Sequence, residues 1–248
     1  MKLKASLYVF AAATLLASGA AVPARAQSPA TQMYRVTTTH VKPDMVTEWV
    51  DLQKNEVVPA LKKGGLKSRT VFVSGLFGNS YEYTLIEPFD SFAQFDGQSP
   101  LVKALDQPGA RRLNEKLRKC IVSQSSYVGN RLLDLSNVVE GDPTFIVTTR
   151  YRIAVGKMDE FQGLVKSELL PVYKKNKVGF LVTRRTLGAN TNDVTLSIAY
   201  KKYADLDGGP MLTKLVGQES AAKINAKFSG IRTPVETLVR SRVADLSF

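Results

Sequence analysis

The chain has 248 residues and a net charge of +12, and it contains a single cysteine, Cys120, and a single histidine, His40. A chain of this length can fold without disulfide bonds, and one cysteine excludes an internal disulfide. A zinc site needs several His, Cys or carboxylate ligands. Neither a glycine-rich phosphate loop nor a G-x-S-x-G motif is present. The sequence therefore argues against a metal site, nucleotide cofactors and serine hydrolysis.

Residues 1–26 have the pattern of a secretory signal peptide. Lys2 and Lys4 precede an apolar run over residues 7–16, and small residues then lead to Ala24-Arg25-Ala26. We expect cleavage after Ala26 and a periplasmic or secreted protein without a membrane span. Removal of three basic residues from the +12 leaves +9. For an exported protein this charge favours anionic small molecules or envelope polymers over nucleic acid, so no nucleic-acid partner is expected.

The rest of the chain shows an internal repeat. "YRVTTTH" (34–40) resembles "FIVTTRY" (145–151), "EWVDLQKNEVVPALKK" (48–63) resembles "EFQGLVKSELLPVYKK" (160–175), and "RLLDLS" (131–136) resembles "RVADLS" (242–247). The offsets are 111, 112 and 111 residues, and two shorter blocks match between them. We predict two homologous units, 33–137 and 144–248, joined by a linker over 138–143 that contains Gly141 and Pro143.

Both units have the same predicted order of elements. A β-rich run (33–41 or 144–153) comes first, and helical spacing of apolar residues follows (45–57 or 158–169). A hairpin comes next (68–89 or 179–202), then a second helical region (99–120 or 210–230) and a last strand (123–135 or 235–246). The second helical regions are interrupted at Pro108-Gly109 and Gly217. Pro59 and Pro171 fall near the ends of the first helices.

The order β-α-β-β-α-β is the ferredoxin-like pattern of the α+β class. Each unit would form a four-stranded antiparallel sheet with helices on one face. The other face of each sheet would be bare. We expect the two bare faces to pack together.

The paired units, with Trp49 or Phe161 on the first helix, resemble the dimeric α+β barrel superfamily. The stretch "EWVDLQKNEVVPALKKGG" is similar to the first helix of its NIPSNAP-like and antibiotic-biosynthesis-monooxygenase-like branches. Most members pair two chains, so the resemblance implies an intramolecular pseudo-dimeric α+β barrel. We expect a monomer and leave association into a homo-oligomer open. The superfamily includes cofactor-free monooxygenases, haem-degrading enzymes, cyclases and proteins without a known reaction, so fold does not fix function.

One face of the first strand offers a candidate site. Side chains alternate along a strand, so Tyr34 and His40 share a face. We expect this aromatic face to pack on the helices, with His40 close to Trp49. The resemblance implies a ligand cleft between sheet and helices, lined by Tyr34, His40, Trp49 and Tyr83. In the alignment above, Tyr151 takes the place of His40, which also suits a structural aromatic ring.

The opposite face offers a second candidate site. Arg35 in the first unit and Arg150 in the second would point toward the interface between the units. Buried polar groups there must be hydrogen-bonded to one another, to water or to a ligand. Both an internally satisfied network and a bound anion fit this pattern.

Three functions fit the sequence. The first is an exported protein that binds an apolar or aromatic small molecule, without a metal or cofactor. The second is a cofactor-independent monooxygenase-like enzyme acting on an aromatic substrate, with His40 as the general base. The third is a haem-binding protein, for which His40 is the one histidine available as an axial ligand. Whether the chain is an enzyme stays open.

Overall fold

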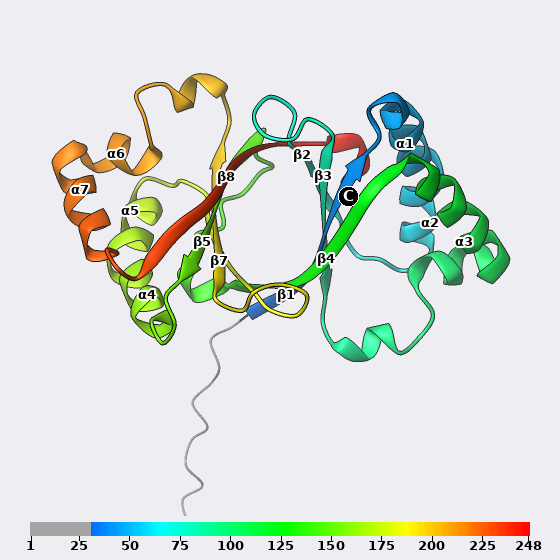
Figure 1. The fold of residues 1–248 in the computed structure, drawn as a ribbon, viewed down its shortest axis with the longest axis horizontal. Helices are drawn as coiled ribbons and strands as arrows, with labels where there is room; N and C mark the ends of the chain where they lie inside the picture. The colour runs from blue at the N-terminus through cyan, green and yellow to red at the C-terminus, as the bar shows by residue number, and fades with distance from the viewer. Residues whose placement is uncertain (1–30) are drawn as a thin grey trace, which may run out of the picture.

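The structure is a computed structural model that describes residues 31–248, so the expected signal peptide lies outside the described residues. Its strands are β1 (Thr31–Val41), β2 (Thr70–Val73), β3 (Glu82–Phe89), β4 (Ile121–Leu132), β5 (Phe145–Ile153), β6 (Phe180–Arg185), β7 (Asp193–Tyr200) and β8 (Arg232–Arg242). They close into one antiparallel barrel in the order β1-β3-β2-β8-β5-β7-β6-β4. Helices cover two opposite flanks of the barrel (Figure 1).

The first helix of each half contains a π-helical turn. In the first half, α1 (Val46–Leu52) continues through η2 (Gln53–Val57) into α2 (Val58–Lys63). In the second half, α4 (Met158–Leu164) continues through η5 (Val165–Leu169) into α5 (Leu170–Lys175). Pro59 and Pro171 lie just after these turns. A proline lacks the N–H donor and crowds the preceding turn, and the wider π turn accommodates it. The helices therefore continue past both prolines.

The second helical regions are each divided by one residue with positive φ. In α3 (Pro100–Cys120) this residue is Asp106, at φ 62°, just before the expected break at Pro108-Gly109. Its carboxylate accepts a hydrogen bond from the Gly109 backbone N–H (2.7 Å). In the second half, Gly217, at φ 80°, separates α6 (Met211–Val216) from α7 (Gln218–Lys227), as predicted. No helix in residues 31–248 is long and apolar enough to cross a membrane.

The two halves join through the edges of their sheets. The first half has the strand order β2-β3-β1-β4, the second has β6-β7-β5-β8, and the pairs β4–β6 and β2–β8 close the barrel. The expectation that the bare sheet faces pack together is therefore wrong. Edge pairing satisfies the backbone groups of edge strands, and it leaves the inner faces around a central space. The fold is α+β, while the origin of both halves from one repeated unit stays a prediction.

The first strands of the two halves correspond with an offset of 112 residues. His40 lies opposite Glu82, and Arg152 lies opposite Asp193. Glu82 and Asp193 each begin the third strand of their half, so Arg152, not Tyr151, is the counterpart of His40. The alignment of the identical Val-Thr-Thr letters at 36–38 and 147–149 is thus one residue out of register with the structure. A shift of one residue moves every side chain of a strand to the other face.

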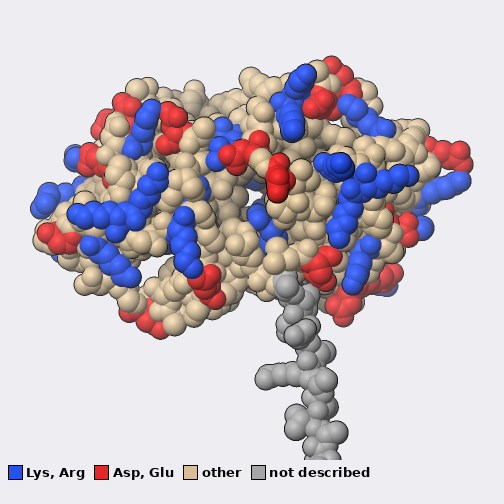
Figure 2. Space-filling view, turned by 180° about the vertical axis from the view of Figure 1, so that it is seen from behind, with Lys and Arg blue, Asp and Glu red and all other residues tan. Residues whose placement is uncertain are grey.

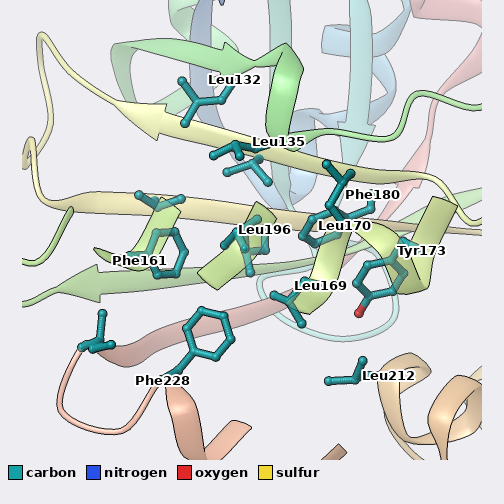
Figure 3. Close-up of a cluster of buried hydrophobic side chains, with 14 of the residues drawn as sticks. Leu132, Leu135, Phe161, Leu169, Leu170, Tyr173, Phe180, Leu196, Leu212 and Phe228 are labelled. Carbon is teal, nitrogen blue, oxygen red and sulfur yellow. The ribbon is translucent and has the colours of Figure 1, made fainter. Parts of the chain in front are cut away.

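Each half has a hydrophobic core between its helices and the outer face of its sheet. The second core surrounds Phe161, Phe180 and Phe228 (Figure 3). It also contains Leu135, from the turn η4 (Leu133–Leu135) that ends the first half. The first core contains Leu246, from the turn η7 (Ala244–Leu246) at the end of the second half. Each half thus contributes its last turn to the core of the other.

Candidate functional site

The inner faces of the eight strands enclose a cavity of about 710 Å³, here called the chamber. Figure 2 shows a hollow in the middle of one face of the molecule, with charged side chains at its rim. Most side chains on the chamber walls are apolar or carry a hydroxyl group, and they include Tyr34, Val36, Thr70, Phe72, Thr84, Ile86, Tyr127, Ile146, Thr148, Leu181, Thr183 and Thr195. Five cationic side chains also line it, Arg131, Lys177, Lys201, Arg240 and Arg242, against three carboxylates, Glu140, Asp142 and Asp205. The chamber therefore combines an apolar wall with cationic groups.

The face of β1 that we expected to pack on the helices lines the chamber instead. Tyr34 and Val36 lie on the chamber wall, whereas Thr39 lies beneath the helices beside Trp49. Both faces of β1 are covered, one by helices and one by the barrel interior. Apolar character therefore does not distinguish the two faces. The prediction for β1 was wrong because it assigned each face to the opposite side of the sheet.

Tyr34 belongs to a short chain of hydrogen bonds on the chamber wall. Its hydroxyl accepts a hydrogen bond from Arg131 Nη1 (2.7 Å) and donates one to Gln32 Oε1. The Arg131 guanidinium also lies over the Tyr34 ring, 4.5 Å from its centroid. Burial raises the pKa of Tyr34. Tyr34 therefore stays a neutral phenol that orients Arg131.

His40 lies on the inner side of β1, away from Trp49, and lines neither of the two cavities described here. Asn79 Nδ2 donates a hydrogen bond to its Nδ1 (2.9 Å). This places the ring proton on Nε2, which is 3.3 Å from Glu82 Oε2. Arg240 Nη2 also binds Glu82 (3.1 Å). The histidine thus lies beside the ion pair of Glu82 and Arg240, and its ring would not reach a haem held in either cavity.

Arg35 and Arg150 are both neutralised by carboxylates. Arg35 lies on the helix side of the sheet, where it binds Glu87 through Nε (3.1 Å) and Nη2 (2.5 Å). Arg150 lies on the inner side, 3.1 Å from Asp193 and 3.6 Å from Glu236. The structure therefore does not bring these two predicted ligand residues together.

Trp49 and Tyr83 do lie together, as the sequence predicted. Their ring centroids are 4.4 Å apart, and both side chains are buried. Beside Trp49 lies a second cavity of about 280 Å³, here called the helix–sheet cleft, lined by Thr39, Trp49, Gln53, Leu85, Asn114, Leu117, Arg118, Ile121 and Gln124. Trp49 Nε1 is buried and has no hydrogen-bond partner within residues 31–248. This is the position in which the resemblance implied a ligand cleft.

Sequence reasoning missed Arg131, which lies with a second arginine, Arg185, at the β4–β6 junction. Burial lowers the pKa of both guanidinium groups, and neither forms an ion pair with a carboxylate of the described residues. Arg185 lies over the ring of Tyr127, 4.3 Å from its centroid. One signal was available, because Arg131 opens the repeated block "RLLDLS". Sequence alone did not say that this block lines a cavity.

In the described part of the chain, no three His, Cys, Asp or Glu side chains gather as metal ligands would. No protein-family model matches the sequence, and no curated protein matches it. Similarity is found among solved structures, at the level of the fold. The arrangement of strands and helices is what these structures share with the chain.

A "putative monooxygenase" from Lactobacillus acidophilus NCFM matches with a TM-score of 0.60 and 12% identity, over 88% of this chain and 96% of that one. An anthrone oxidase-like protein matches with a TM-score of 0.56 and 11% identity, over 86% and 91%. A chlorite dismutase from Candidatus Nitrospira defluvii matches with a TM-score of 0.53 and 10% identity, over 86% and 92%. Identities this low show the fold alone. The chain therefore has the fold that the resemblance predicted, a dimeric α+β barrel, with both halves supplied by one polypeptide.

Proposed function

We propose that this chain is an exported small-molecule-binding protein and that its ligand, with an apolar or aromatic body, binds in the chamber. The volume of the chamber is the observation that carries the proposal. Ligand sites usually measure roughly 300–1,000 Å³ and have mostly apolar walls with a few polar groups. The chamber, at about 710 Å³, has this size and this kind of wall. Export rests on the signal-peptide pattern of residues 1–26.

A neutral fluorescent probe, N-phenyl-1-naphthylamine, tests binding in the chamber. We expect its emission to rise with saturation at one site per chain. Leu181→Trp places a large ring inside the chamber and should weaken probe binding at least tenfold. Val155→Trp adds the same ring at a side chain that is 89% exposed and should leave binding unchanged. Equal binding by the wild type and Leu181→Trp would contradict the proposal.

A cofactor-independent monooxygenase-like enzyme is the second candidate, favoured by the helix–sheet cleft. Buried donors nearly always have a hydrogen-bond partner, and a bound ligand is one explanation where the protein offers none. Trp49 Nε1 is such a donor within residues 31–248. Two of the matching structures described above carry the names monooxygenase and anthrone oxidase-like, which is consistent with this candidate. An aromatic substrate that accepts a hydrogen bond from Trp49 would fit the cleft.

Oxygen uptake with a panel of hydroquinones and anthrones tests the second candidate. Activity should be lost in Trp49→Phe, which keeps the aromatic ring but removes the donor. His40→Gln is the control. It should keep its activity if the reaction takes place in the cleft, because the sheet lies between His40 and the cleft. Loss of activity in His40→Gln with full activity in Trp49→Phe would contradict a reaction in the cleft.

A further inference from the structure

Arg131 is a partly buried cation on the chamber wall whose Nε is fully buried, and it has no carboxylate partner in residues 31–248. We propose that the chamber binds a small organic carboxylate and that Arg131 binds its anionic group. This inference rests on the proposed function and names the class of molecule that the chamber takes.

The contacts of Arg131 leave its charge uncompensated. Its one hydrogen bond to a described residue runs from Nη1 to the neutral hydroxyl of Tyr34, and its Nε is buried without a partner. A guanidinium does not lose its proton in proteins, and a buried charge is normally paired. Stacking on the Tyr34 ring compensates this charge only in part. An anion in the chamber would supply the missing partner.

The other half of the barrel provides an internal comparison. Arg131 lies opposite Thr183 at the β4–β6 junction, and Arg242 lies opposite Phe72 at the β2–β8 junction. These are corresponding places, since Arg131 and Arg242 open the two matching blocks of the repeat. Arg242 is 3.0 Å from a carboxylate oxygen of Asp142 in the linker. Among residues 31–248 Arg131 has no such neighbour, so one of the two corresponding arginines lacks a carboxylate partner there.

The carboxylates in and around the chamber form no ion pair with Arg131. Glu140, Asp142 and Asp205 line the chamber without pairing with it, and two more carboxylates lie along the inner faces of the strands. Glu82 binds Arg240 and His40, and Asp193 binds Arg150 and Arg152. Arg185, close to Asp193, also lacks an ion pair among the described residues and donates from Nε to the Thr195 hydroxyl (3.3 Å). The inner wall therefore has an excess of positive charge, which favours a negatively charged ligand.

The geometry of Arg131 suits a carboxylate with an apolar body. The chain from Gln32 through Tyr34 to Arg131 holds the guanidinium in one orientation, and an oriented guanidinium binds a carboxylate well. Ile86, Ile146 and Leu181 line the same cavity and offer an apolar surface to the rest of the ligand. Such a ligand would use both parts of the chamber.

A matched pair of probes tests this inference: 1-naphthaleneacetate and its amide, which have nearly the same shape but differ in charge. Dissociation constants are measured by isothermal titration calorimetry. We expect the wild type to bind the acid at least tenfold more tightly than the amide. Arg131→Met should remove this preference and leave the affinity for the amide within twofold. Arg131→Lys keeps the charge and should retain part of the preference, and it serves as the second variant if Arg131→Met does not fold.

Arg111→Gln is the matched control, because it removes one positive charge from the exposed surface of α3. It should retain the preference for the acid. If the wild type binds acid and amide equally and Leu181→Trp weakens both, the carboxylate inference is wrong while binding in the chamber stands. A preference that survives in Arg131→Met overturns the role of Arg131. If the acid, the amide and N-phenyl-1-naphthylamine all fail to bind, the inference and the proposed function are both wrong.

Discussion

Glu87 binds two arginine side chains on the helix side of the first half. It pairs with Arg35, and its Oε1 is 3.6 Å from Nε of Arg69, a side chain that is 2% exposed. Burial is the main cause that lowers the pKa of Arg69 to about 10. Removal of one partner from a buried ion pair leaves an uncompensated charge, which typically costs about 3–5 kcal/mol. We expect Glu87→Gln to lower the free energy of unfolding by this amount, measured by urea denaturation.

Glu56→Gln is the control for this prediction. Glu56 pairs with Lys116 on the surface, where both side chains are about half exposed. Exposed ion pairs contribute only about 0–1 kcal/mol. An equal loss of stability in Glu56→Gln and Glu87→Gln would show that Arg69 does not depend on Glu87.

For single residues, the sequence predicted which side chains lie together better than it predicted which face of the sheet they occupy. Trp49 and Tyr83 were expected together and are in contact. His40 was expected beside Trp49 and lies on the other side of the sheet. Alternation fixes which residues share a face, but not which face meets the helices when both are covered. Arg131 was missed because its environment comes from strands of both halves.

Among the elements, the contact between α2 and α3 depends on a glycine. A Cβ atom at Gly64, which ends α2, would lie 1.9 Å from the backbone oxygen of Pro100 at the start of α3. The backbone would have to move, so we expect Gly64→Ala to destabilise the protein by about 1–3 kcal/mol. Gly163 in α4 has no atom within 4 Å of such a Cβ. Gly163→Ala should therefore stabilise the protein, by up to about 1 kcal/mol.

Thermal unfolding followed by circular dichroism compares the two alanine variants. The expected shifts have opposite signs, and a loss of stability in both variants would refute the close approach at Gly64.

The sequence predicted most elements because their signals are local: apolar spacing, glycine and proline. It did not predict the π turns before Pro59 and Pro171, since apolar spacing alone does not separate a π turn from an α-helix.

In the whole molecule, the exchanged turns η4 and η7 connect the stability of the two halves. Leu246 is fully buried in the core of the first half. Removal of a buried leucine side chain costs about 2–5 kcal/mol. We expect Leu246→Ala to lower the urea midpoint of the entire chain in one transition. Leu133→Ala, at a side chain that is 40% exposed, should have little effect.

Two spectroscopic signals monitor the unfolding of Leu246→Ala. Fluorescence of Trp49, the single tryptophan, reports on the first core, and circular dichroism reports on both halves. A midpoint shift in the fluorescence alone would contradict a connection between the halves.

The sequence predicted a barrel of two halves through the resemblance, but the exchanged turns depend on contacts between segments far apart in the chain. No local pattern encodes such contacts.

The exchanged turn η7 also sets an order of events during synthesis. A chain that emerges N-terminus first exposes Trp49 and its neighbours long before Leu246 appears, although all of them belong to one core. The first core therefore stays incomplete while nearly two hundred further residues are made, and contacts between such distant residues form slowly. During that interval the open apolar surface is a target for chaperones and for aggregation. The turn that completes the first core is thus the step that ends this exposure.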